Sequence, residues 1–196
     1  QKAAIRAVCE NVETGLRRSL LVMATGTGKT RVAASLTDVL SRGGYVTNVL
    51  FLADRKALVR QAKAAFMEYL GSTNYTYCNL VENKDDKNAR MVFSTYPTML
   101  NAINEEKKKD GKKLFSEAHF DLVIIDDLGA ELENQFNSMA FYNIVNLRQN
   151  IMRPMIINTN LSFKEIEQRY SQRMMSRLLS YRCLKFAGTD IRQIKM

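Results

Sequence analysis

Apolar and polar residues follow one another along the chain in two distinct patterns. The first is a short, almost continuous apolar run of the kind that forms parallel strands covered on both faces. Such runs predict strands over residues 20–23, 48–53, 91–95, 121–126 and 155–158. Two further strands are expected over 75–80, within a more polar segment, and over 182–186. The second is an apolar residue at every third or fourth position, which is typical of helices with one buried side. Helices are predicted over 1–16, 29–42, 54–70, 134–150 and 163–179, the last divided or broken, with a short helix starting at Pro97.

The alternation of strands and helices favours one architecture, a doubly wound sheet. We therefore predict an α/β protein with three α/β/α layers and a mostly parallel sheet. A single domain over residues 1–196 is expected, because the chain has no internal repeat and no low-complexity linker. Right-handed crossovers would place the carboxyl ends of the strands at one edge. For the helix predicted over 134–150, the expected buried side consists of Phe136, Met139, Ile144, Val145 and Leu147.

A glycine-rich turn follows the first apolar run, in the sequence Leu20-Leu-Val-Met-Ala-Thr-Gly-Thr-Gly-Lys-Thr30. A strand, such a turn and a helix opening with Lys-Thr form the signature of a phosphate-binding P-loop. The two glycines let successive backbone N–H groups point at an anion, and the start of the helix adds its positive dipole end. The residues expected to bind ATP or ADP here are Thr25, Gly26, Thr27, Gly28, Lys29 and Thr30, with Thr30 also on Mg²⁺. Met23 stands where the strict pattern has a further glycine.

Two aspartates close the apolar run at 121–126, namely Asp126 and its neighbour Asp127. In a P-loop protein, an acid at the end of such a strand holds Mg²⁺ through water, which predicts a metal ligand at Asp126. A second acid can activate the attacking water, so Asp127 is the candidate catalytic base, with Glu131 as the nearest substitute. A solvated turn is the alternative interpretation of the pair.

Amides and arginines later in the chain are further candidates. Asn160, or Asn158 two residues earlier, could contact the terminal phosphate, although asparagine also serves as a turn residue or helix cap. An arginine can stabilise the charge of a phosphoryl-transfer transition state. The arginines considered for this role are Arg173, Arg177, Arg182 and Arg192, each of which could equally be an ordinary surface residue.

The net charge of +9 over 196 residues indicates polyanionic partners such as DNA, although a lysine-rich segment at 105–113 supplies part of the excess. No apolar run approaches the roughly 20 residues that span a bilayer, so no membrane partner is expected. The polar start is unlike a signal peptide, and the three cysteines lack metal-ligand spacing. We therefore expect a cytoplasmic protein with reduced thiols. One histidine, His119, excludes a histidine-based metal site.

From residue 1 to about 126 the chain resembles the superfamily 2 helicase-like motor domain of type I restriction enzyme R subunits. The matching residues are Gln1, Met23-Ala-Thr-Gly-Thr-Gly-Lys-Thr30, Leu50-Phe-Leu-Ala-Asp-Arg55, Leu58, Gln61, Ser94-Thr-Tyr-Pro-Thr98 and Phe120-Asp-Leu-Val-Ile-Ile-Asp126. The resemblance implies that Gln1 approaches the adenine and that Arg55 and Thr95 lie on the path of a DNA strand. That family continues with Asp-Glu-Ala-His, whereas this chain reads Asp126-Asp-Leu-Gly129.

From about residue 121 to 196 the chain resembles helicase-loader AAA+ ATPases of the DnaC type. The matching residues are Ile124-Ile-Asp-Asp-Leu-Gly-Ala-Glu131, Asn134, Pro154 through Thr159-Asn-Leu-Ser162, Arg169-Tyr170 and Arg173-Met-Met-Ser-Arg-Leu178. The resemblance implies that Asp126 and Asp127 form the Walker B pair and that Asn160 is the first sensor. It also implies that Arg177 is an arginine finger for a neighbouring subunit, and that Arg192 is a late arginine sensor.

The meeting of two families at the Walker B strand leads us to interpret the chain as an engineered chimera of P-loop domains, joined near residues 122–128. A natural hybrid is the alternative. The expected function is Mg²⁺-dependent ATP binding with slow or absent hydrolysis in a monomer or weak oligomer. The alternatives are a nucleic-acid-binding motor or loader fragment, and a scaffold without a selected activity.

Overall fold

The computed structural model describes residues 1–82, 88–104, 114–129 and 135–186. Its centre is a sheet of seven strands in the order β3-β4-β2-β5-β6-β1-β7, in which each neighbouring pair is parallel. The strands are β1 (Arg18–Met23), β2 (Val49–Ala53), β3 (Tyr77–Asn79), β4 (Met91–Thr95), β5 (Leu122–Leu128), β6 (Met155–Thr159) and β7 (Arg182–Phe186). The predicted α/β fold is confirmed.

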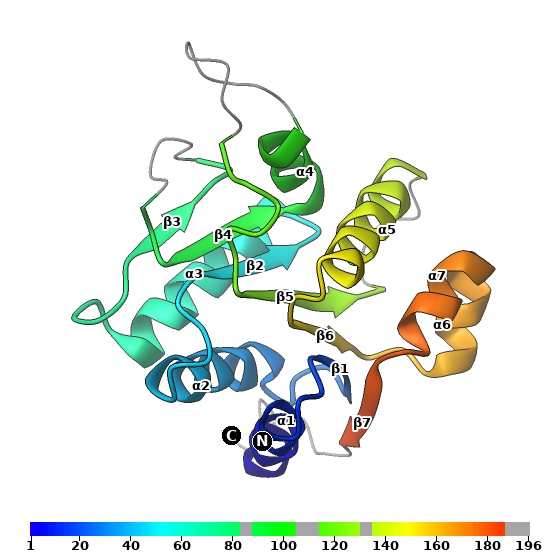
Figure 1. The fold of residues 1–196 in the computed structure, drawn as a ribbon, viewed down its shortest axis with the longest axis horizontal. Coiled ribbons are helices and arrows are strands. Elements are labelled where there is room, and N and C mark those ends of the chain that lie inside the picture. Colours follow the sequence, from blue (N-terminus) through cyan, green and yellow to red (C-terminus); the bar gives the residue numbers. More distant parts are fainter. Residues whose placement is uncertain (83–87, 105–113, 130–134, 187–196) are drawn as a thin grey trace.

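Helices cover both faces of this sheet, with α1 and α2 on one side and α4 and α5 on the other (Figure 1). The helices are α1 (Lys2–Glu13), α2 (Lys29–Arg42), α3 (Lys56–Leu70), α4 (Tyr96–Asn104), α5 (Gln135–Asn150), α6 (Phe163–Arg169) and α7 (Gln172–Leu178). The segment predicted as one broken or two short helices is therefore two. A capping box at Ser162 and Glu165 begins α6, and the Ser171 side chain caps α7.

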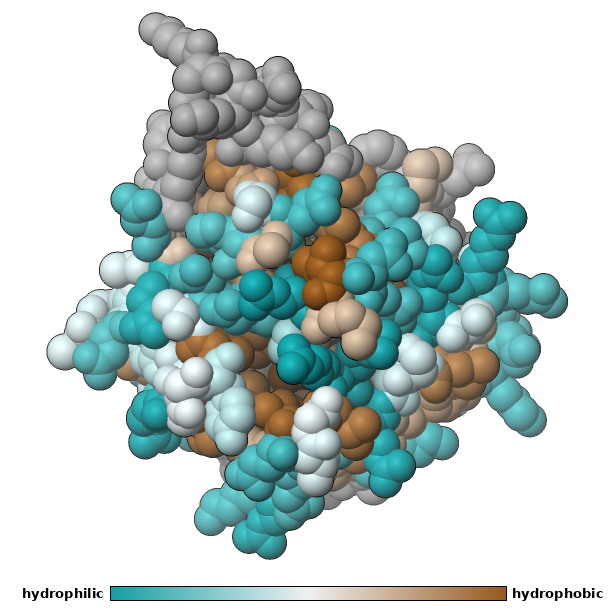
Figure 2. Space-filling model, in the orientation of Figure 1, coloured by the Kyte–Doolittle hydropathy of each residue, from teal (hydrophilic) through white to brown (hydrophobic). Residues whose placement is uncertain are grey.

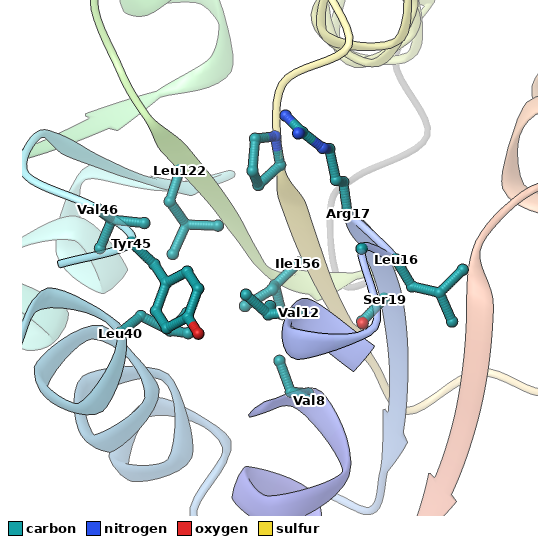
Figure 3. A pocket seen from close by; sticks show the side chains of 12 residues that line it. Val8, Val12, Leu16, Arg17, Ser19, Leu40, Tyr45, Val46, Leu122 and Ile156 are labelled. Carbon is teal, nitrogen blue, oxygen red and sulfur yellow. The ribbon is translucent and has the colours of Figure 1, made fainter. Parts of the chain in front are cut away.

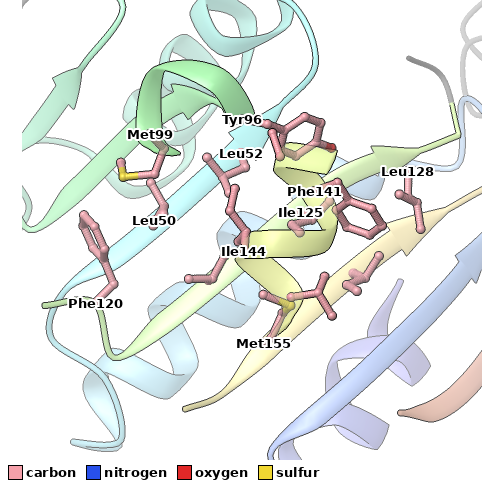
Figure 4. Close-up of a cluster of buried hydrophobic side chains, with 14 of the residues drawn as sticks. Leu50, Leu52, Tyr96, Met99, Phe120, Ile125, Leu128, Phe141, Ile144 and Met155 are labelled. Carbon is pink, nitrogen blue, oxygen red and sulfur yellow. The ribbon is translucent and has the colours of Figure 1, made fainter. Parts of the chain in front are cut away.

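Successive residues of a strand enter opposite cores. On β2, Leu50 and Leu52 pack with the side chains of α4 and α5, as Figure 4 shows. Phe51 between them enters the other core, where its ring lies 5.4 Å from that of Phe66 on α3 and 5.5 Å from that of Phe93 on β4. This period of two, with both faces buried, explains why the strands read as continuous apolar runs.

Among the side chains that the structure describes, the buried side of α5 differs from the prediction at one position; the side chain of Phe136 lies outside them. Met139 is 56% exposed, whereas Phe141 is 2% exposed and packs against the sheet. The predicted Ile144 and Val145 are buried. Apolar residues lie on more than one side of this helix, so their spacing alone could not decide which side faces the core.

Polar residues cover most of the face seen in Figure 2, with smaller apolar areas between them. Within the described residues, none of the helices combines the length and the apolarity that crossing a membrane requires. The three cysteines are free thiols.

Strand order determines which side chains meet at the carboxyl edge. Strand β6 lies between β1, which leads into the glycine-rich turn, and β5, which carries the two aspartates. The residues that follow β1, β5 and β6 therefore converge at this edge, although they lie up to 135 positions apart in the chain.

Candidate nucleotide-binding site

The turn after β1 has the backbone shape that its glycines permit. Gly26 and Gly28 have φ angles of 77° and 86°, a left-handed conformation in which residues with a side chain are strained. Gly28 is also the residue before α2, and no side chain caps that helix. The first N–H groups of α2 therefore point out of the helix end toward the turn, where they can bind an anion.

The first turn of α2 contacts both aspartates of β5. The Lys29 ammonium forms an ion pair with the Asp127 carboxylate. The Thr30 hydroxyl donates a hydrogen bond of 3.2 Å to Asp126 Oδ2. Lys29 is 9% exposed and the Asp127 side chain 30% exposed, so this ion pair is partly shielded from water. The structure thus brings together four of the residues that the sequence singled out.

An irregularity in β5 directs the two carboxylates to one place. Along a regular strand, Asp126 and Asp127 would point to opposite faces. Here β5 pairs with β6 at Ile125 and next at Leu128, opposite Ile157 and Thr159, so β5 carries an extra residue. Asp127 has a φ of 56° within this bulge. The bulge turns both carboxylates toward the start of α2.

The next strand supports Asp126 from the other side. Asn158 on β6 is 0% exposed, and its Nδ2 donates a hydrogen bond of 3.0 Å to Asp126 Oδ1. Its Oδ1 is buried and has no hydrogen-bond partner among the described residues. Asn160, the candidate sensor, lies just beyond β6, and its Nδ2 is 3.3 Å from Thr25 Oγ1 in the glycine-rich turn.

The environment of Asp126 favours its neutral form. Burial raises the pKa of this carboxyl group, and the charge of Asp127 raises it further. Hydrogen bonds from Asn158 and Thr30 and the charge of Lys29 lower the pKa, but burial is the larger effect. A divalent cation beside Asp126 would favour the charged carboxylate. The carboxylate and the Thr30 hydroxyl are hard oxygen donors of the kind Mg²⁺ prefers, so these two residues fit a magnesium ion.

A cavity of about 440 Å³ opens in front of these groups. Its lining includes Thr25, Gly26, Gly28, Lys29, Thr30, Asp126 and Asp127 from the predicted site. The opposite wall comes from α3 and includes Gln61 and Tyr69. The centre of the Tyr69 ring lies 5.0 Å from the guanidinium carbon of Arg31 on α2. The sequence prediction did not single out Arg31 or Tyr69, because they lie on separate helices and no local spacing links them.

Gln1 also reaches the glycine-rich turn. Its side-chain amide donates a hydrogen bond of 3.0 Å to the carbonyl of Thr27. The Thr27 hydroxyl donates one of 2.7 Å to the carbonyl of Ala24 and so closes the turn. Both residues therefore contact the backbone of the loop.

The structure places Arg177 away from the loop. On α7, its Nε donates a hydrogen bond of 3.1 Å to Asn146 Oδ1 on α5, and its guanidinium lies 4.7 Å from the ring centre of Tyr142. Arg173 is exposed on the same helix, and Arg182 begins β7 at the opposite edge of the sheet. Arg192 and Glu131 lie outside the described residues.

The two residues assigned to a DNA path lie near the carboxyl edge. Arg55 follows β2 by two residues, and its Nε is 3.0 Å from the carboxylate of Asp54. Thr95 ends β4, is 7% exposed and donates a hydrogen bond of 2.9 Å to the Thr98 hydroxyl. Thr95 therefore presents little surface to a ligand.

A glycine-rich turn that joins β1 to α2, with the acid-bearing strand two positions away in a parallel sheet, defines a class of protein. The chain is a P-loop nucleoside triphosphatase domain. It belongs to the family described as "Type III restriction enzyme, res subunit", whose model matches residues 1–152. This range extends past residues 122–128 to just beyond the end of α5.

Curated relatives include two endonuclease subunits from Escherichia coli. The chain is 33% identical to the type I restriction enzyme EcoAI endonuclease subunit over 129 residues, and 44% identical to the EcoKI subunit of strain K12 over 66. These matches cover 65% and 34% of this chain, but only 15% and 6% of the relatives. The chain is thus similar to a small part of much longer proteins.

Solved structures with a similar fold include two kinds of protein. The UvsW helicase of bacteriophage T4 has a TM-score of 0.62 at 17% identity, and the match covers 90% of this chain and 58% of the UvsW chain. Domain III of the replication initiation protein DnaA from Thermotoga maritima has a TM-score of 0.58 at 12% identity, and the match covers 99% of this chain and 65% of the DnaA chain. A helicase and a replication initiation protein thus share the fold of this chain.

Proposed function

We propose that this domain binds ATP together with Mg²⁺ and that, as an isolated domain, it hydrolyses ATP slowly or not at all. The observation that carries the proposal is the meeting of the first turn of α2 with both aspartates, Lys29 with Asp127 and Thr30 with Asp126. Few sites other than a nucleotide phosphate site need a lysine, a hydroxyl and two carboxylates around a helix start.

Binding would replace contacts within the protein by contacts to phosphate. The Lys29 ammonium would leave the Asp127 carboxylate and bind phosphate oxygens. These oxygens would then neutralise the charge of Lys29. The N–H groups at the start of α2 would bind the same phosphates. Bound Mg²⁺ would neutralise phosphate charge, and Thr30 and Asp126 are the residues that would hold it.

One feature supports slow hydrolysis. The candidate finger, Arg177, is held by Asn146 and Tyr142 of its own chain. Among the described residues, the one arginine that lines the cavity is Arg31, which lies against Tyr69. Phosphoryl transfer depends strongly on such a positioned charge.

Thermal unfolding of the whole chain, with and without Mg²⁺ and ATP, tests the binding proposal. A ligand at 100 times its dissociation constant stabilises the folded state by about 2.7 kcal/mol, so saturating ATP should raise the melting temperature by several degrees. The Lys29→Ala variant should lose this increase. Lys56→Ala is the matched control, since Lys56 opens α3 as Lys29 opens α2 but follows no glycine-rich turn. Absence of any ATP effect on the wild-type chain would refute the proposal.

Phosphate release measures turnover in the same preparations. We expect a rate well below about 1 s⁻¹, the low end for typical enzymes. Arg177→Ala should leave any monomer rate unchanged, because a finger acts on a neighbouring subunit. A large fall in a verified monomer would contradict that assignment.

A second proposal concerns nucleic acid, favoured by the net charge of +9 and by membership of a restriction-enzyme family. Retention of single-stranded DNA should then weaken steeply as salt rises, and binding indifferent to salt would refute it. A scaffold without a selected activity would show neither ATP binding nor salt-dependent DNA binding.

We also propose that the two parts of the chain have different origins, joined near residues 122–128. The support comes from the sequence, which reads Asp126-Asp-Leu-Gly129 where the first family has Asp-Glu-Ala-His. The family match continues past this point to residue 152 and does not mark the junction. A natural protein of one family carrying the same sequence from 1 to 196 would refute it.

A further inference from the structure

The amino edge of the sheet, opposite the glycine-rich turn, carries a second polar cavity. Three segments border it: residues 15–18 at the start of β1, residues 148–153 at the end of α5, and residues 180–182 at the start of β7. The cavity has a volume of about 170 Å³. It is therefore a separate site, and β1 connects the two, because its beginning borders this cavity and its end leads into the glycine-rich turn.

Arginines dominate this cavity, and we name it the arginine pocket. Its lining contains Arg17, Arg18, Arg148, Arg153 and Arg182, and no acidic residue. The acid nearest to the group is Asp121, whose Oδ1 lies 3.2 Å from Arg153. Asp121 also accepts hydrogen bonds from the backbone N–H groups of Thr47 and Asn48. Positive charge thus exceeds negative charge, which raises the free energy of the unliganded pocket and favours an anion.

Arg148 forms a rigid part of the wall. It is 3% exposed and donates hydrogen bonds of 2.8, 3.1 and 2.8 Å to the carbonyls of Phe120, Asp121 and Pro154. Burial and, to a smaller extent, the charge of Arg153 lower the pKa of Arg148 to about 10. The group is still protonated at neutral pH. Its Nε is buried without a hydrogen-bond partner among the described residues, so a buried charge here is only partly compensated.

A strained residue positions the next arginine. Met152 follows α5 with a φ of 55°, a conformation that favours glycine, and its side chain is 63% exposed. Its N–H bonds the carbonyl of Gln149, and the N–H of Arg153 bonds the carbonyl of Arg148. This reversal of the chain places Arg153 beside Arg148. Strain of this kind is more frequent at functional sites.

We propose that the arginine pocket binds a phosphate group, independently of the nucleotide site. Guanidinium groups match phosphate oxygens in pairs of parallel hydrogen bonds. Among the described residues no acid pairs with Arg17, Arg18 or Arg182, so these three side chains can turn to a ligand, while Arg148 and Arg153 are fixed by the protein.

The neighbouring cavity indicates what the phosphate is attached to. A mainly apolar cavity of about 240 Å³ shares Gly15, Leu16 and Arg17 with the arginine pocket. Val12, Tyr45 and Ile156 face one another across it (Figure 3). A phosphate monoester with a compact apolar group could occupy both cavities. A phosphodiester of DNA offers similar phosphate oxygens to the arginines but does not carry the compact apolar group.

The experiment uses the whole chain with Lys29→Ala, which weakens phosphate binding at the nucleotide site to the same extent in every variant compared. Its probes are 1-naphthyl phosphate, titrated calorimetrically, and a fluorescein-labelled 15-nucleotide oligo(dT), followed by anisotropy. The test pair is Arg17→Gln with Arg182→Gln. The control pair, Arg6→Gln with Arg60→Gln, removes the same charge from exposed positions outside the pocket. Circular dichroism verifies that every variant folds.

A phosphate site predicts that the test pair weakens binding of at least one probe tenfold or more, while the control pair changes it less than twofold. Loss confined to 1-naphthyl phosphate identifies a free organic phosphate as the source, and loss confined to oligo(dT) identifies DNA. Equal weakening by both pairs would mean general charge attraction and would overturn the proposal. Failure of both probes to bind the parent chain would overturn it too. The Lys29→Ala background separates these outcomes from the fate of the ATP proposal.

Discussion

The two edges of the sheet carry positive charge in different ways. At the carboxyl edge, Lys29 is paired with Asp127, and helix N–H groups supply further attraction for an anion. At the amino edge, five arginines line one pocket, and the acid in contact with them is Asp121. In the proposed function, Mg²⁺ would offset the acids of the first site, whereas the lining of the second site contains no acid. Mg²⁺ should therefore distinguish the two edges.

The largest effect is expected at the turn that follows the two aspartates. Gly129 has a φ of +95°, and a Cβ there would lie 2.2 Å from Leu161 Cδ1. Left-handed strain and overpacking together should lower the free energy of unfolding of Gly129→Ala by about 3 kcal/mol. Gly44→Ala is the control, with a φ of +74° and open space, and should cost about 1 kcal/mol. Urea denaturation measures both, and equal losses would show that Leu161 moves aside.

Replacing Asp126 tests the metal site proposed at the carboxyl edge. Asp126→Asn should weaken binding of ATP in the presence of Mg²⁺ about 30-fold, or about 2 kcal/mol, and leave binding without Mg²⁺ nearly unchanged. Calorimetric titrations in Mg²⁺ and in a chelator give the comparison. A variant that still responds to Mg²⁺ like the wild type would place the metal elsewhere.

The same variant has an expected pH dependence. Burial raises the pKa of Asp126 above the ordinary value of 3.8, so the folded protein binds this proton more tightly than the unfolded chain. Its contribution to stability therefore falls as pH rises from 3.8 through the raised pKa. Without metal, Asp126→Asn should be more stable than wild type at neutral pH, by about 1 kcal/mol, and the difference should shrink on acidification. A constant difference in urea midpoints across pH would contradict this.

Relief of strain at the amino edge should give a smaller, stabilising effect. Met152→Gly removes the left-handed strain at the end of α5 and should raise the free energy of unfolding by about 0.7 kcal/mol. Met139→Gly is the control, since Met139 is also exposed but lies within α5, and should lose about 0.8 kcal/mol. Loss of stability in both variants would show that the Met152 side chain makes useful contacts.

The smallest effect concerns charge repulsion in the arginine pocket. Arg17→Gln with Arg182→Gln should raise stability by roughly 0.3 kcal/mol in phosphate-free buffer of low ionic strength. Salt should remove the gain, because screening weakens repulsion between exposed charges. Thermal unfolding in 20 mM and 500 mM sodium chloride measures it. A decrease in stability at low salt would mean that these arginines have attractive partners.

Much of the carboxyl edge was predictable because its signals are local. The glycines, Lys29 and Thr30 lie within five positions, and the aspartates end an apolar run. The functions assigned to Asp127, Asn160 and Arg177 stay predictions. For Arg177 the family resemblance could not indicate the contacts with Asn146 and Tyr142, which depend on how α5 and α7 pack.

The sequence by itself determined the element order, the parallel sheet and the phosphate-binding turn, because apolar periodicity and glycine conformation act over a few residues. Only the tertiary structure decided that Asp126 and Asp127 face the same helix, because a bulge is defined by its pairing with β6. It also decided that Phe141 rather than Met139 is buried on α5. The arginine pocket is the clearest case, since its charges come from three segments that are separated in the chain and meet only where strands begin side by side.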